Sequence, residues 1–320
     1  MKNYGFIRVA AAVPAIKVAN TKHNTEEICK LTSEAFDRKV SLVVFPELSL
    51  TGSTCGDLLG HTTLLSQAEK GVKEIIEISR GKSTAIVVGT PVKYQGRIYN
   101  CAAVIRNGEL KGLAPKICTA ETGFTFASGD TLTTPAEIKY AGQTCILSPN
   151  LLFELGSATF AVEIGQDINS PVPSSAFSCM AGAQIIAHPA SESEVINTDT
   201  LRRQRLSELS SRNICAYIHA GAGFGESTQD LVFAGAADIY ENGEARFQME
   251  SSLTIADIDI EKLETERSRR HSFNSATSTV SHTRISLGNL CNTDFEEDLY
   301  RFVEPHPFTP TERADQICRE

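Results

Sequence analysis

The chain has 320 residues, of which 41% are hydrophobic and 22% are charged, a composition typical of a globular protein with a substantial core. Its net charge of -9 argues against sequence-independent nucleic-acid binding, which needs a basic surface. No apolar run approaches the length of a membrane span, and the N-terminal segment MKNYGFIRVAAAVPA predicts a strand and not a signal peptide. We therefore expect a cytoplasmic protein without nucleic-acid or membrane partners.

The metal-binding residue types are scattered along the chain. Neither the nine cysteines nor the seven histidines show the spacing of a zinc site. Most of the cysteines stand in apolar runs, which favours buried free thiols in a reducing compartment. The sequence thus predicts no metal.

The first third of the chain alternates strand and helix patterns. A strand is predicted at 6–12, followed by a helix that Asn24 caps and that continues through Ile28, Leu31 and Ala35. The next strand covers 40–45 and ends at Pro46. A second amphipathic helix carries apolar residues from 68 to 76, with Gly81 as its stop.

Further strands and one long helix follow. The helix is predicted over Thr198–Arg212, and the strands over 84–89, 98–105, 158–164, 184–187, 216–220 and 231–239. Several strands follow one another with only a turn between them, which favours mixed sheets with outer helices over a TIM barrel. From about residue 261 the pattern weakens. The basic cluster of Arg267, Arg269 and Arg270 indicates a solvated helix end, and the proline-punctuated segment 305–310 indicates an extended arm.

Two charged residues follow predicted strands. Glu47 comes directly after the strand at 40–45, at the sheet edge where α/β proteins bind ligands, and such a carboxylate can act as a general base. Lys116 follows another strand-like segment, and a lysine there can stabilise an oxyanion. Taken alone, each residue is more simply interpreted as a solvated surface residue.

A third segment has the pattern of a nucleophile elbow. The strand at 158–164 runs into Gly165-Gln166-Asp167, a sharp turn of the kind that presents a catalytic nucleophile. Glycine has no side chain with which to attack a substrate. It can adopt the strained turn, and its N–H can still face an oxyanion.

These three positions, in this order, resemble the glutamate–lysine–cysteine set of the nitrilase (carbon–nitrogen hydrolase) superfamily. The wider pattern resembles the N-terminal glutaminase domain of glutamine-dependent NAD⁺ synthetases. The motifs that carry this resemblance are FPELSLTG at 45–52, TCGDL at 54–58, YNCAA at 99–103, PVPSS at 171–175, GEST with DLVF at 225–233 and EPHPF at 304–308.

The resemblance implies an α/β fold, the nitrilase-like α-β-β-α sandwich. It implies a domain at 1–260 and a C-terminal extension at 261–320, which resembles the connector to a synthetase domain. ATP and deamido-NAD⁺ would bind that synthetase domain, supplied in cis or in trans, so we expect no cofactor in this chain. Glutamine would be the ancestral substrate, and a homo-oligomer is expected.

The departures from the family pattern concern the site itself. Gly165 stands where the family carries its nucleophilic cysteine. Thr122 stands at a tyrosine of the substrate cap, and Phe124 and Ala127 stand at its two glutamates. Glu192 replaces a serine of a Ser-Ala-Ser motif near the substrate. We therefore expect that this chain does not hydrolyse glutamine.

Three interpretations remain open at this point. The preferred one is a pseudoenzyme that retains the fold for assembly or regulation. The second is an active amidase in which Glu47 activates water and Lys116 stabilises the oxyanion. The third is an oligomerisation or regulatory module whose pocket binds a small amide or nothing. A substitute nucleophile at Cys118 or Cys179 is disfavoured, because neither residue lies at a strand-to-helix turn.

Overall fold

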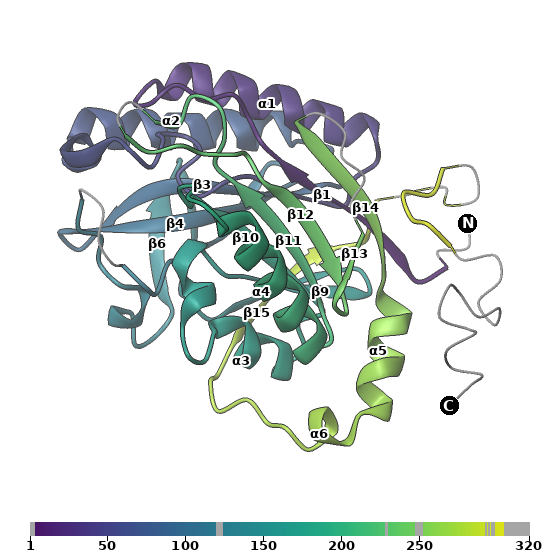
Figure 1. Ribbon diagram of the computed structural model, residues 1–320. Helices are drawn as coiled ribbons and strands as arrows, with labels where there is room; N and C mark the ends of the chain where they lie inside the picture. The colour runs from purple at the N-terminus through teal and green to yellow at the C-terminus, as the bar shows by residue number, and fades with distance from the viewer. Residues whose placement is uncertain are drawn as a thin grey trace.

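The computed structural model describes residues 4–119, 124–227, 230–246, 252–291, 293, 295 and 298–303. These residues form two β-sheets packed face to face, and α1 and α2 lie together on one side of the pair while α3 and α4 lie on the other (Figure 1). The layers therefore run helix, sheet, sheet, helix. This arrangement confirms the predicted α-β-β-α sandwich.

The first sheet has eight strands, with β1, β2 and β3 parallel at its centre and β4 and β5 antiparallel beside them. In spatial order its strands are β14 (Leu253–Asp259), β1 (Phe6–Ala12), β2 (Leu42–Val44), β3 (Ala85–Tyr94), β4 (Arg97–Arg106), β5 (Glu109–Pro115), β7 (Gln143–Leu147) and β6 (Ala136–Tyr140).

The second sheet has seven strands, with β9, β10 and β11 parallel at its centre. In spatial order its strands are β13 (Glu244–Ala245), β12 (Ala237–Glu241), β11 (Ala216–Gly221), β10 (Ile185–Ala190), β9 (Ala158–Val162), β8 (Leu151–Leu155) and β15 (Thr283–Gly288). The central strands of both sheets are therefore parallel, and their carboxyl ends lie at one edge of each sheet. Sites in such folds usually lie at that edge.

Helices cover the outer faces of the two sheets. α1 (Thr21–Asp37) and α2 (Thr62–Ile78) pack on the first sheet, and α3 (Ser174–Met180) and α4 (Thr198–Arg212) pack on the second. The remaining helices are α5 (Ile260–Arg269), α6 (His271–Asn274) and the 3₁₀ turns η1 (Gly56–Gly60), η2 (Gly129–Thr131) and η3 (Gly165–Asn169). Within the described part of the chain, no helix combines the length and apolarity needed to span a bilayer.

The main core lies between the two sheets. Phe153 and Phe160 stack there with ring centroids 5.1 Å apart, and neither is more than 1% exposed. Each such buried side chain contributes roughly 1.5–3 kcal/mol to the free energy of unfolding. This packing holds the ends of β2, β5 and β9 in a fixed relation, so side chains that follow those strands are positioned precisely.

Three sequence predictions need correction. α1 begins at Thr21 and not at Asn24, because Asn20 supplies its cap by accepting a hydrogen bond from the His23 N–H at 3.1 Å. Asn24 is instead fully buried, and its amide donates to the carbonyls of Lys17 and Leu50. A side chain with this hydrogen-bonding capacity suits either role, and only the tertiary fold decides between them.

The strand predicted at 231–239 begins only at Ala237. Before that point Gly235 has a φ of +69°, and its N–H donates to the Ala222 carbonyl at 2.9 Å, so the chain makes an irregular turn. Leu231 and Phe233 are apolar because they line a cavity, and not because they belong to a strand.

The C-terminal segment is attached to the sandwich. β15 pairs in parallel with β8, and α5 packs near β1. Arg267 is 9% exposed and donates to the carbonyls of Ile214 and Ala183, so it is not part of a solvated helix end as predicted. The division at residue 261 stays a prediction, and the arm at 305–310 lies outside the described residues.

Candidate functional site

The three residues singled out by strand position meet at one place. Glu47 follows β2, Lys116 follows β5, and Gly165 follows β9 across the interface between the sheets. The Lys116 Nζ lies 2.6 Å from Glu47 Oε1, and both side chains are almost completely buried. Burial disfavours the charge on Lys116, but the adjacent Glu47 carboxylate outweighs it, so the pKa of Lys116 is raised. The pair is therefore a charged, buried ion pair.

Glu47 is held from several sides. Asn100 on β4 donates from Nδ2 to the same Oε1 atom at 2.6 Å. The backbone turns sharply after Glu47, with Leu48 at a φ of +50°, and it passes very close to Gly89 on β3. A Cβ at Gly89 would overlap the Leu48 nitrogen and the Pro46 carbonyl oxygen, so only glycine permits this approach.

Gly165 stands directly against this ion pair. Its φ is +49°, a left-handed conformation that side-chain-bearing residues rarely adopt. A Cβ at this position would overlap Glu47 Oε2 and would lie 3.0 Å from Lys116 Nζ. The Glu47 carboxylate thus occupies the space that a side chain at residue 165 would need.

Two buried carboxylates shape the elbow on either side of Gly165. Glu163 accepts hydrogen bonds from the Ser175 N–H at 2.9 Å and from the Tyr217 hydroxyl at 3.2 Å. Asp167 accepts from the backbone N–H groups of Ile117 at 2.9 Å and Cys118 at 2.5 Å. Burial raises the pKa of both carboxyl groups, that of Asp167 to about 6. Asp167 therefore ties the elbow to the segment that carries Lys116.

A pair of buried histidines contacts the backbone of the elbow. His188 on β10 and His219 on β11 stand side by side in register, with their Nδ1 atoms 2.9 Å apart. His188 Nε2 lies 3.0 Å from the Gly165 carbonyl oxygen, which can only accept. His188 must therefore carry its proton on Nε2, and a neutral His188 then accepts a hydrogen bond from the protonated Nδ1 of His219. The two rings fix the backbone at Gly165.

Because of the histidine pair, we expect the free energy of unfolding to fall in acid. Burial lowers the pKa of His188 from 6.5 to about 4, so the folded protein keeps this ring neutral while the unfolded chain takes up a proton. The stabilisation is complete above pH 6.5 and is lost as the pH falls toward 4. We expect the difference in free energy of unfolding between the wild type and His188→Gln to shrink by about 2 kcal/mol from pH 7 to pH 5.

Urea unfolding of both proteins at the two pH values measures this change. The difference between the proteins is the relevant quantity, because the raised pKa of Asp167 acts in the opposite direction and is common to both. A difference that stays constant over this pH range would show that His188 is not held neutral.

A cavity of about 510 Å³ opens above the ion pair. Glu47, Asn100 and Lys116 line it. Glu192 also lines it, and its Oε1 atom lies 3.5 Å from Gln166 Nε2. Burial raises the pKa of Glu192. The remaining lining residues are Leu48, Ser53, Thr54, Gly56, Thr119, Phe124, Phe126, Ser191, Ser193, Ser227, Leu231 and Phe233. Thr122 lies outside the described residues.

No cysteine lines this cavity in the described part of the chain. Cys118 borders a separate space of about 240 Å³ on the other side of Asp167, and burial together with the Asp167 charge raises the pKa of its thiol. Cys179 is buried in α3, and Cys145 is buried in β7 against the outer core of the first sheet. Neither Cys118 nor Cys179 lines the cavity, so neither is placed to act there as a substitute nucleophile.

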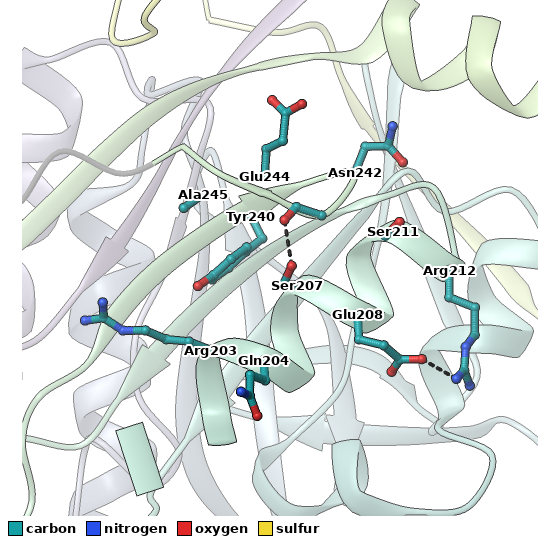
Figure 2. A pocket seen from close by; sticks show the side chains of 11 residues that line it. Arg203, Gln204, Ser207, Glu208, Ser211, Arg212, Tyr240, Asn242, Glu244 and Ala245 are labelled. Carbon is teal, nitrogen blue, oxygen red and sulfur yellow. Dashed lines mark hydrogen bonds and ion pairs between the residues drawn. The ribbon is translucent and has the colours of Figure 1, made fainter. Parts of the chain in front are cut away.

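A larger groove of about 950 Å³ lies elsewhere, between α4 and the turn joining β12 to β13 (Figure 2). Its walls carry exposed side chains of both charges, including the Arg212–Glu208 ion pair that Figure 2 shows at its edge. It shares no lining residue with the cavity above Glu47. The lining residues of the groove include no buried carboxylate, lysine, arginine or histidine, so the smaller cavity is the candidate site. In the described residues no group of His, Cys, Asp or Glu side chains is arranged to hold a metal ion.

Sequence reasoning missed several residues of the site. Asn100 lies in one of the motifs that carried the resemblance, and a polar residue inside the apolar run of β4 was the available signal. Glu226 is 1% exposed and accepts hydrogen bonds from the Ser53 hydroxyl and the Thr54 N–H, both at 2.9 Å, which fixes one wall of the cavity. The contribution of His188 follows only from the pairing of β10 with β11.

Comparisons with known proteins agree with this geometry. The family model described as carbon-nitrogen hydrolase matches residues 8–135. The glutamine-dependent NAD(+) synthetase of Mycobacterium leprae is 32% identical over 338 residues, which cover 99% of this chain and 49% of that protein. The synthetase of Aquifex aeolicus is 27% identical over 68% of this chain. The chain thus spans about half the length of the Mycobacterium leprae protein and 35% of the Aquifex aeolicus protein.

Solved structures share the fold. A glutamine-dependent NAD(+) synthetase from Cytophaga hutchinsonii matches 82% of this chain and 44% of its own with a TM-score of 0.69 and 21% identity. A mutant of the Nesterenkonia sp. AN1 amidase, described with a covalent acetamide adduct at the active site cysteine, matches 85% of this chain and 97% of its own with a TM-score of 0.64 and 15% identity. At these identities the likeness concerns the fold alone.

Proposed function

Because this chain belongs to the carbon–nitrogen hydrolase superfamily and is related over almost its whole length to glutamine-dependent NAD(+) synthetases, we propose that it is a glutaminase-type domain that no longer hydrolyses glutamine. In this proposal the fold and the pocket are retained for assembly, binding or regulation. The chain is then a pseudoenzyme, as the elbow sequence predicts.

The observation that carries this proposal is the arrangement at Gly165. Covalent amide hydrolysis needs a nucleophile at the elbow, within reach of a base, and Gly165 offers none. The Lys116 Nζ lies 2.6 Å from Glu47 Oε1, and Glu47 Oε2 stands where a side chain at 165 would begin. The pair therefore fills the reaction centre instead of flanking it.

The walls of the cavity support the same proposal. Phe124, at a family glutamate position, lines the cavity with an apolar ring, and Glu192 brings a carboxylate to a family serine position. A site built for glutamine needs polar groups matched to its substrate, and changing several of them together removes that match. Loss of nucleophile and loss of recognition thus coincide.

The partners follow from the relatives. In the proposed function glutamine is the ancestral substrate, and a synthetase domain in cis or in trans binds ATP and deamido-NAD⁺ and takes its nitrogen from free ammonia. This chain itself holds no cofactor. We further propose that it works in the cytoplasm as a homo-oligomer or together with the synthetase domain.

The alternative of an active amidase requires Glu47 to activate water. Glu47 Oε1 already accepts hydrogen bonds from Lys116 and Asn100, each at 2.6 Å, and the Lys116 charge is committed to Glu47. That oxygen is therefore already occupied and is not free to take a proton from water, and the same lysine is drawn away from an oxyanion. The geometry therefore favours the pseudoenzyme.

The proposed function predicts no ammonia release from glutamine. Purified chain is incubated with glutamine, and ammonia is measured with a coupled glutamate dehydrogenase assay beside an active glutamine-dependent NAD(+) synthetase as positive control. We expect the wild type and Glu47→Gln to match the enzyme-free background equally. Release by the wild type that Glu47→Gln abolishes would establish the water-activating amidase instead.

A further inference from the structure

The cavity above Glu47 has a charge balance that no hydrolytic role requires. Three charged side chains line it, namely Glu47, Lys116 and Glu192. Among the described lining residues Lys116 is the sole cation, and it is paired with Glu47 at 2.6 Å. Their charges cancel, so the Glu192 carboxylate gives the cavity a net charge of -1.

Within the described residues the Glu192 carboxylate makes no ion pair, and Arg205 and Arg202, which act on its charge from farther away, do not line the cavity. Its carboxylate accepts from the Gln166 amide at 3.5 Å, which is a weak partner for a charge. The guanidinium of the nearby Arg202 bonds to Glu194 at 2.5 Å, Asp199 at 2.6 Å and Asp238 at 3.2 Å, and it is not among the lining residues. A partly buried carboxylate in this setting is stabilised by a cation that enters the cavity.

Aromatic rings complete the environment. Phe124, Phe126 and Phe233 all line the cavity, and the first two stand edge to face with centroids 5.0 Å apart. The faces of aromatic rings attract cations, and an aromatic wall beside a carboxylate is a common arrangement for binding organic ammonium groups. These rings also offer apolar area to the body of such a ligand.

The same walls disfavour an anion. The N–H groups of Ser53 and Thr54, which could hold a carboxylate, already donate to Glu226 at 2.5 and 2.9 Å. That places a second carboxylate directly behind this wall. The cavity therefore presents acceptors and negative charge to whatever enters it.

We propose that this cavity binds a small organic cation, with an ammonium group against Glu192 and an apolar or amide body between the phenylalanine rings. This inference rests on the proposed function, since it assigns a ligand class to the pocket that remains after hydrolysis is lost. The ligand is an amine without a carboxylate, and amino acids, glutamine among them, are excluded by the charge of the walls.

A series of amides that differ only in charge tests the proposal. Butyramide is neutral, γ-aminobutyramide is a cation, glutaramate is an anion and L-glutamine is a zwitterion, while all four share the carboxamide end. Isothermal titration calorimetry at pH 7.5 is expected to give γ-aminobutyramide about tenfold tighter binding than butyramide. Glutaramate and glutamine are expected to bind more weakly than butyramide.

Matched variants assign the preference to one side chain. Glu192→Gln keeps the shape and is expected to bring γ-aminobutyramide down to the level of butyramide. Glu137→Gln makes the same change in net charge at an exposed position on β6 and is expected to leave the tenfold preference intact. Equal binding of all four amides, or a preference that survives Glu192→Gln, overturns the proposal.

Ammonia measured in the same samples tests the proposed loss of hydrolysis separately from the proposed ligand class. Ammonia release shows that the proposed loss of hydrolysis is wrong, whatever the binding order. Selective binding of the cation without ammonia release supports both statements, and absence of ammonia without any preference for the cation overturns the ligand assignment alone.

Discussion

Replacing Glu47 with alanine is expected to lower the free energy of unfolding by about 3–5 kcal/mol, because removal of one partner of a buried ion pair strands the other charge. Lys116 is 9% exposed, its Nζ lies 2.6 Å from Glu47, and its amide N–H bonds to the Asn100 carbonyl at 2.8 Å. It cannot turn outward to water without disturbing β5. Urea unfolding followed by circular dichroism measures the loss.

Two comparisons show that the loss comes from the stranded charge and not from the missing methylene groups. The double variant Glu47→Leu with Lys116→Met removes both charges and is expected to be more stable than Glu47→Ala. Glu77→Ala removes an ion pair with Arg80 whose side chains are 51% and 61% exposed, and it is expected to change stability very little.

The pH dependence supplies an independent signature. In the wild type, Glu47 raises the pKa of Lys116, so the stabilisation from the pair is complete below pH 10.5 and is lost above it. In Glu47→Ala, burial is opposed mainly by the Asp167 charge, and we expect the lysine pKa to fall, so the penalty disappears as the pH rises. The difference between the two proteins should therefore shrink toward pH 10. A difference below about 1 kcal/mol at pH 7 would mean that Lys116 is solvated when Glu47 is absent.

The strand ends that carry this pair were predictable from sequence, and the reason is physical. Apolar runs such as 40–45 must be buried, a proline ends them, and the next polar residue then stands at a sheet edge. Chain order alone placed Glu47, Lys116 and Gly165 together once the resemblance was recognised. The helix Thr198–Arg212 was also predicted with its observed bounds.

The parts that sequence reasoning missed depend on tertiary contacts. Arg267 resembles a solvated residue until Ile214 and Ala183 present their carbonyls to it. Phe233 resembles a strand residue until the cavity is known. The overlap between a side chain at residue 165 and Glu47 depends on the position of one carboxylate oxygen, which comes from the other sheet. No local sequence pattern predicts that position.

Gly165→Cys is expected to lower the free energy of unfolding by about 3 kcal/mol and not to restore ammonia release from glutamine. About 1 kcal/mol comes from placing a Cβ at a φ of +49°, and about 2 kcal/mol come from displacing Glu47 Oε2 from its position beside Lys116. Adding Gln166→Glu does not relieve this overlap. Thermal unfolding and the ammonia assay on both variants measure the two effects.

A matched glycine separates the two contributions to that loss. Gly81 has a φ of +69°, and a Cβ there would meet no atom within 4 Å, so Gly81→Ala is expected to cost only the backbone contribution of about 1 kcal/mol. Gly165→Ala should cost about 2 kcal/mol more than this control in the wild type. The excess should vanish in a Glu47→Ala background, because the overlapping atom is then gone. Persistence of the excess there would show that Glu47 is not its source. Glutamine hydrolysis by Gly165→Cys would show that Glu47 yields to a side chain at residue 165, and the loss of the nucleophile would then be reversible by one substitution.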